Sequence, residues 1–92
     1  MAQAQRIVEI QNLRGLHARA SAKFVQCAEQ FPDAEVTVLK DNDSVSALSI
    51  MGLMMLAAAK GSFITLQATG TQALEALNAL EALVNDKFHE GE

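Results

Sequence analysis

A histidine and an arginine stand two residues apart, just after a glycine, near the start of this 92-residue chain. Segment 14–21 reads Arg-Gly-Leu-His-Ala-Arg-Ala-Ser, and a stretch with helical periodicity follows it. An imidazole, with an ordinary pKa of about 6.5, can attack phosphorus at neutral pH. The free N–H groups at a helix start bind anions, and Arg19 adds donors suited to phosphate oxygens. The segment therefore predicts a phosphohistidine site with His17 as the nucleophile and the backbone of Ala18, Arg19 and Ala20 around the phosphate.

Composition and charge exclude several other classes of function. Half of the residues are hydrophobic, which predicts one globular domain over residues 1–92, with an ordered core at 5–88 and a tail at 89–92. A net charge of −4 and the absence of Trp and Tyr argue against nucleic-acid binding. The single Cys27 cannot form an internal disulfide and is expected to be a small packing residue. No Cys/His cluster has metal-ligand spacing, so we expect neither a metal nor a cofactor.

The sequence predicts no membrane segment. The start of the chain has no apolar signal core. The longest apolar run, residues 50–59, is about half of the roughly 20 residues that a bilayer requires. We therefore expect a cytoplasmic protein.

Hydrophobic periodicity predicts seven elements in the order β-α-β-β-α-β-α. The expected strands are 5–10, 35–39, 44–47 and 62–68. The first expected helix spans 18–31 and is ended by Pro32. A short second helix begins at Ile50 with Ser49 as its N-cap, and a last helix opens at 70–71. The last helix is expected to bury one stripe, made of Leu74, Leu77, Leu80, Val84 and Phe88. This order predicts an α+β fold, a two-layer open-faced sandwich in which three helices cover one face of a four-stranded antiparallel sheet.

Three segments resemble one known family in the same order. Residues 15–19, Gly-Leu-His-Ala-Arg, resemble the active-site signature of HPr, the histidine-containing phosphocarrier of the phosphoenolpyruvate-dependent phosphotransferase system. Residues 48–54 resemble the regulatory-serine segment of that family. Residues 59–61 and 76–80 resemble its C-terminal part, and the similarity extends from about Ile7 to about Val84.

The resemblance implies a carrier of phosphoryl groups rather than a free-standing enzyme. His17 would accept the group on Nδ1 from enzyme I and pass it to an enzyme IIA-type protein, with Arg19 as the charge partner of the phosphate. Ser49 would be the site of an HPr kinase/phosphorylase where that enzyme is present. The resemblance also places a partner-binding surface between the His17 loop and the short helix, with a patch made of Ile50, Met51 and Met54. Helical spacing lets Met51 and Met54 face outward in this patch.

The chain departs from the family pattern at two places. Most members carry proline after the arginine, whereas this chain has Ala20 followed by Ser21. Alanine leaves one more backbone N–H facing the site, so the change need not disable phosphate binding. Arg14 stands where small polar residues are frequent, and it either adds positive potential near the phosphate or is a solvated side chain.

Two rival functions follow from the same residues. One is a regulatory interaction module that acts mainly through Ser49 and its binding partners, and the other is an α+β domain that binds a small ligand. The second rival would not need both the His17 segment and the Ser49 segment in this register. The residues do not separate sugar uptake from the nitrogen-related regulatory branch, although Ala20 and Ser21 favour the regulatory branch.

A monomer is expected, because a carrier must present His17 to two partners in turn. His89 is expected to lie in a solvated end of the chain.

Overall fold

The computed structural model describes residues 3–90 and contains four strands, three α-helices and one 3₁₀ turn. The strands are β1 (Gln3–Glu9), β2 (Glu35–Lys40), β3 (Asp43–Ser46) and β4 (Phe63–Thr69). The helices are α1 (Ala18–Ala28), α2 (Ile50–Met55) and α3 (Ala73–Asn85), and the 3₁₀ turn η1 spans Lys87–His89. No helix among these described residues is long and apolar enough to cross a bilayer.

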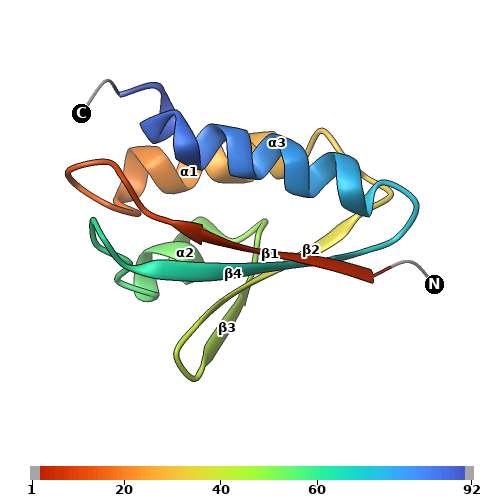
Figure 1. Ribbon diagram of the computed structural model, residues 1–92, viewed down its shortest axis with the longest axis horizontal. Helices are drawn as coiled ribbons and strands as arrows, with labels where there is room; N and C mark the ends of the chain where they lie inside the picture. Colours follow the sequence, from red (N-terminus) through yellow and green to blue (C-terminus); the bar gives the residue numbers. More distant parts are fainter. Residues whose placement is uncertain (1–2, 91–92) are drawn as a thin grey trace.

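The four strands form one antiparallel sheet in the order β1-β4-β2-β3. Helices α1 and α3 lie side by side over one face of this sheet (Figure 1). The short helix α2 packs against α1 and β3. The arrangement is an open-faced α+β sandwich with three helices, and the sequence prediction is confirmed.

Period-two alternation along the strands builds the core between the sheet and the helices. In β4, Ile64, Leu66 and Ala68 are buried, whereas the residues between them are more exposed. Leu77 and Leu80 of α3 are also fully buried and belong to the same core. Burying each large aliphatic side chain contributes about 1.5–3 kcal/mol, so this interface fixes the positions of the two long helices relative to the sheet.

Helix α1 is shorter than the sequence predicts. It ends at Ala28, not at Phe31, and Gln30 and Phe31 donate backbone hydrogen bonds to residues three positions back. The residue before a proline is disfavoured in the helical region, so Pro32 acts on Phe31 and the helix ends before it. Phe31 is half-buried and packs against the core from the turn instead.

Helix α3 also differs from the predicted apolar stripe. Leu74 is 59% exposed, and the helix ends at Asn85, before the last predicted member of the stripe. Phe88 is nevertheless fully buried, because the backbone breaks into positive φ from Lys87 to His89 and turns the ring inward. A single helical period could not predict this break, which directs the end of the chain toward the β1–α1 loop (Figure 1).

Gly15 allows the β1–α1 loop to approach the connection between α2 and β4. Its φ is +64°, and a Cβ at this position would lie 2.2 Å from the carbonyl oxygen of Ala58. The next residue, Leu16, donates its backbone N–H to that same oxygen at 2.9 Å. A residue without a side chain is therefore required here both by conformation and by space.

We expect Gly15→Ala to destabilise the fold more than Gly61→Ala does. Gly61 also has a positive φ, of +89°, but nothing lies within 4 Å of a Cβ built there. Gly61→Ala should cost about 1–2 kcal/mol for the left-handed backbone alone. Gly15→Ala should cost about 1–3 kcal/mol more, because the loop must also move away from Ala58. Urea unfolding of both variants tests this, and equal losses would contradict the packing role of Gly15.

Candidate functional site

His17 is the N-cap of α1. Its backbone is extended, with φ −75° and ψ −177°, and the helix begins at the next residue. The backbone N–H of Arg19 donates to Nδ1 of the imidazole at 3.3 Å, while the His17 carbonyl accepts from the N–H of Ser21 at 2.9 Å. Nδ1 therefore faces the first turn of a helix, where backbone N–H groups lack partners and favour an anion.

The other ring nitrogen of His17 contacts a carboxylate from the far end of the chain. Nε2 lies 2.7 Å from Oε2 of Glu90, and the two side chains are 22% and 13% exposed. Because Nδ1 accepts a hydrogen bond, the proton of a neutral imidazole must be on Nε2. The ring is thereby oriented with the Nδ1 lone pair toward the helix start.

Three cationic side chains share a pocket with His17. The pocket has a volume of about 280 Å³, and it is lined by Leu13, Arg14, His17, Arg19, Lys23, His89 and Glu90. Arg19 and Lys23 lie four positions apart on α1, so they lie on the same side of that helix. Arg14 is exposed and reaches the same pocket from the loop, which supports the alternative in which it adds positive potential to the site. The arrangement suits a doubly charged phosphoryl group.

Buried hydrogen bonds fix the loop that carries His17. Asn12 is fully buried and donates from Nδ2 to the carbonyl of Gly15 at 2.8 Å. Ser21 is also fully buried, and its hydroxyl donates to the carbonyl of Leu16 at 3.1 Å. Ser21, in the first turn of α1, therefore fixes the loop that precedes the helix. It directly follows Ala20, which stands at the position where the family pattern has proline.

Ser49 caps the second helix, as predicted. Its Oγ accepts the backbone N–H of Gly52 at 2.9 Å, and its side chain is half-buried. Around it, Met51 is 69% exposed, and Ile50 and Met54 are also exposed. We call the full set of exposed apolar side chains here the α2 patch, and it consists of Leu48, Ile50, Met51, Met54 and Met55. The sequence analysis did not single out Leu48 and Met55.

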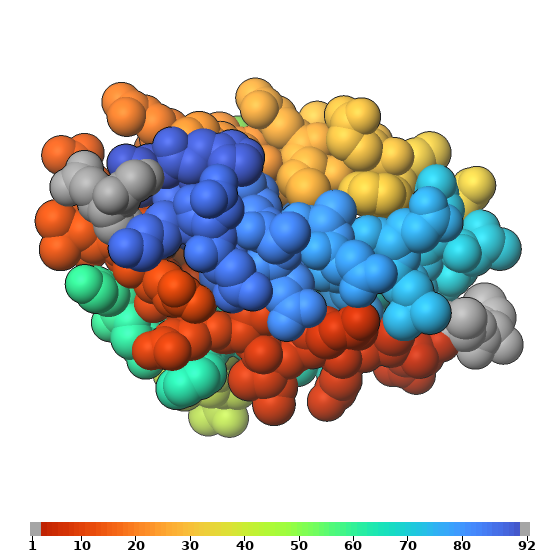
Figure 2. Space-filling model, turned by 45° about the horizontal axis from the view of Figure 1, so that its top comes forward, coloured from red at the N-terminus to blue at the C-terminus, as the bar shows by residue number. Residues whose placement is uncertain are grey.

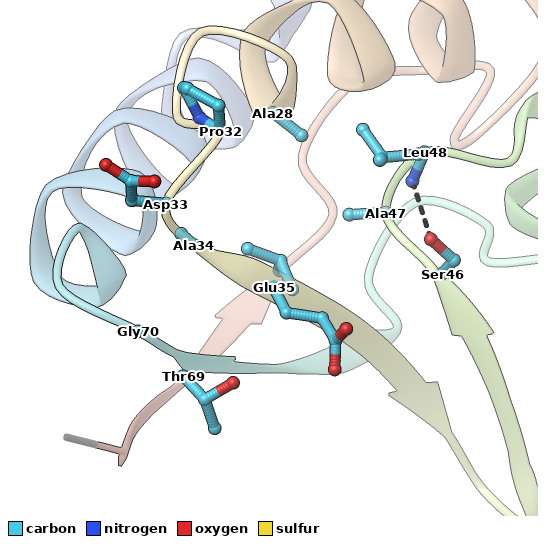
Figure 3. A pocket seen from close by; sticks show the side chains of 11 residues that line it. Ala28, Pro32, Asp33, Ala34, Glu35, Ser46, Ala47, Leu48, Thr69 and Gly70 are labelled. Atoms are coloured by element: carbon cyan, nitrogen blue, oxygen red, sulfur yellow. Dashed lines mark hydrogen bonds between the residues drawn. The ribbon is translucent and has the colours of Figure 1, made fainter. Parts of the chain in front are cut away.

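The larger pocket at the other end of α1 lacks the features of an anion site. A pocket of about 620 Å³ lies between the end of α1, the start of β2 and the β3–α2 connection (Figure 3). Its lining includes the carboxylates of Asp33 and Glu35 and no cationic side chain, so it would repel a phosphoryl group. Within residues 3–90, no three His, Cys, Asp or Glu side chains form a metal-binding group. Burial raises the pKa of the half-buried Cys27 thiol, which favours a packing role.

The sequence analysis missed three contributors to the site, which are Asn12, Lys23 and Glu90. Lys23 could have been found, because it follows Arg19 by four residues on a predicted helix. Glu90 fell in a segment that the sequence analysis assigned to a solvated tail at 89–92. The structure instead describes the chain as far as Glu90, whose carboxylate contacts His17. The dark blue C-terminal part of the described chain lies beside the orange β1–α1 segment (Figure 2). His89 is exposed and contacts Asp86.

Comparisons with known proteins identify the family of this chain. Residues 4–86 match the family model described as the PTS HPr component phosphorylation site. The phosphocarrier protein HPr of Neisseria meningitidis is 55% identical over 85 residues, which cover 92% of this chain and 94% of that protein. The phosphocarrier protein NPr of Shewanella violacea is 44% identical over 90 residues, which cover 98% of each chain.

A solved structure shares the fold as well. The crystal structure of HPr-C-His from Thermoanaerobacter tengcongensis superposes with a TM-score of 0.89 at 44% identity and covers 95% of this chain and 97% of that one. The sequence match and the shared fold both extend over nearly the whole chain. The chain belongs to the HPr family of phosphocarriers of the phosphotransferase system.

Proposed function

We propose that His17 accepts a phosphoryl group on Nδ1 from phosphorylated enzyme I and passes it to a histidine of an enzyme IIA-type protein. The contact pattern of the imidazole is the observation that carries the proposal. Nε2 is engaged by Glu90, whereas Nδ1 faces the first turn of α1 with only a long hydrogen bond of 3.3 Å from Arg19 N–H. Nδ1 is therefore the nitrogen that a phosphorus atom can approach.

The charges around His17 suit transfer in both directions. Phosphoryl transfer depends mainly on positioning and on charge stabilisation of a loose transition state. Arg14, Arg19 and Lys23 supply positive charge within one small pocket. Arg14 and Arg19 are exposed, so water screens their attraction and the group can leave as readily as it arrives. The residues around His17 therefore act as a moderate clamp.

The α2 patch is the proposed docking surface for both partners. It presents large, flexible apolar side chains that adapt to different surfaces. Exposed clusters of this kind mark sites of protein–protein contact more often than isolated apolar residues do. A carrier that uses one surface for two partners binds them in turn, and this is why we also propose that it works as a monomer.

We expect enzyme I and phosphoenolpyruvate to add one acid-labile phosphoryl group to the wild-type protein and none to His17→Ala. Intact-mass measurement before and after acid treatment checks this. His89→Ala is the matched control, because His89 is the second of two histidines and is exposed. It should still carry one acid-labile phosphoryl group, because His17 is retained, whatever the rate at which the group is added. Phosphorylation of His17→Ala, or its loss in His89→Ala alone, would contradict the assignment.

We further propose that phosphorylation of Ser49 slows transfer to His17. Ser49 lies at the start of α2 beside Ile50 and Met51 of the patch. A phosphate there adds about −1.5 to −2 charges, and a helix start tolerates that charge locally. The inhibition must then arise where the patch meets an acidic or closely fitting partner surface.

We expect Ser49→Asp to slow phosphorylation of His17 by enzyme I about tenfold or more, a change equal to ~1.4 kcal/mol in the transfer step. Ser44→Asp is the control, because it adds the same charge at an exposed position on β3. The next residue, Val45, lies against Gly52 of α2, and successive side chains of a strand point to opposite faces, so Ser44 points away from α2. Ser49→Ala should keep the transfer rate and lose about 1 kcal/mol of folding stability with its cap. Stopped-flow transfer assays on the three variants decide the matter, and wild-type kinetics in Ser49→Asp would remove this proposal.

A further inference from the structure

We infer that Glu90 is a positioning residue for phosphoryl transfer, whose carboxylate keeps the imidazole proton of His17 on Nε2 and so keeps Nδ1 unprotonated. The inference rests on the proposed function of His17 and names a group that this function requires. It starts from the 2.7 Å contact between Glu90 Oε2 and His17 Nε2. A neutral imidazole carries its proton on one nitrogen or the other, and the partner of each nitrogen decides which.

Both partners of the His17 ring favour the same tautomer. On one side the backbone N–H of Arg19 can only donate, so Nδ1 must accept. On the other side a carboxylate can only accept while it is ionised, so Nε2 must donate. Because the two side chains are 22% and 13% exposed, water screens their contact less than it screens a surface pair. The tautomer with a reactive Nδ1 is therefore favoured by two contacts together.

The carboxylate itself is held at both oxygens. Asn12 donates from Nδ2 to Oε1 of Glu90 at 3.1 Å, while Oε2 faces His17. Asn12 is fully buried and also bonded to Gly15, so the same side chain positions both the loop and the carboxylate. Such a shared partner keeps Glu90 and His17 in a fixed relation.

The path of the chain before Glu90 also supports a role for this contact. Lys87, Phe88 and His89 all have φ between 54° and 63°, a region that costs non-glycine residues about 1–2 kcal/mol each. The fully buried Phe88 ring and the hydrogen bond from Lys23 Nζ to the Phe88 carbonyl, at 2.6 Å, offset this cost. Backbone strain of this kind clusters at functional sites, and here it delivers a carboxylate to the nucleophile.

Glu90 is a carboxylate in a pocket whose other titratable side chains are cationic residues and histidines. Three cationic side chains, Arg14, Arg19 and Lys23, line the same pocket as Glu90, and His89 also lines it. Burial alone would raise the pKa of Glu90, but hydrogen bonds from His17 and Asn12, with the charges of His17 and Lys23, hold it below its usual range. Glu90 is therefore ionised at neutral pH.

The proton held on Nε2 keeps the transfer step free of proton movement. The Nδ1 lone pair forms the new N–P bond, and the electron pair of the broken N–P bond returns to the histidine of the donor. The ring of His17 gains positive charge as the bond forms, with its proton still on Nε2, and the Glu90 carboxylate stabilises that charge. When the group leaves, the electron pair returns to Nδ1 and the original tautomer is restored.

Long-range ¹H–¹⁵N spectra of the unphosphorylated protein, with the imidazole in its neutral form, test the tautomer directly. We expect the Nε2–H form to dominate in the wild type and in the control Glu75→Gln, which changes an exposed carboxylate of α3. Glu90→Ala should give a mixture of tautomers and a transfer rate from enzyme I that is about 10-fold to 100-fold lower. Glu90→Gln keeps the size of the side chain and loses its charge, so it should also transfer more slowly than the control.

The inference requires both changes in Glu90→Ala. An unchanged tautomer, or a changed tautomer with the wild-type transfer rate, would overturn it. If enzyme I could not phosphorylate the wild-type protein on His17, the proposed function would be contradicted instead. The two failures can be told apart, because the tautomer is measured without any partner protein.

Discussion

The orientation of one imidazole is the constraint on which the rest of this structure depends. His17 lies between a backbone N–H at the start of α1 and a carboxylate at the end of the described chain, and each contact uses one ring nitrogen. The first contact comes from the N-cap geometry, and the second requires a chain that returns past α3 to the β1–α1 loop (Figure 2). A shift of either segment by an ångström would turn the ring and misdirect Nδ1.

The sheet and its helices supply the rigidity that this geometry needs. Strand β1 leads into the loop of His17, and its partner β4 begins after the connection that Gly15 approaches. The buried faces of β4 and α3 fix the start of the C-terminal turn, from which Phe88 enters the core. The site thus combines two exposed arginines, Arg14 and Arg19, with a histidine whose loop is fixed by buried hydrogen bonds.

Sequence reasoning was strongest where one local signal determined the outcome. The period of β4, the serine cap of α2 and the Gly-x-His-x-Arg pattern predicted a strand, a helix start and the place of His17 at the start of α1, because each depends on neighbours in the sequence. It failed at the end of α1, because Pro32 disfavours helical geometry at the preceding residue, Phe31. It also failed after Asn85, where backbone with positive φ breaks the helix. Glu90 could not be predicted, because its contact with His17 joins residues 73 positions apart through a turn with no glycine.

The nitrogen that carries phosphorus is the most direct test of this account. A ¹H–¹⁵N–³¹P spectrum of the protein phosphorylated by enzyme I distinguishes the two ring atoms of His17. The geometry predicts phosphorus on Nδ1 and a retained proton on Nε2, since Glu90 engages Nε2 at 2.7 Å. Phosphorus on Nε2 would contradict the account, because that atom could then be reached only after the contact with Glu90 had been broken.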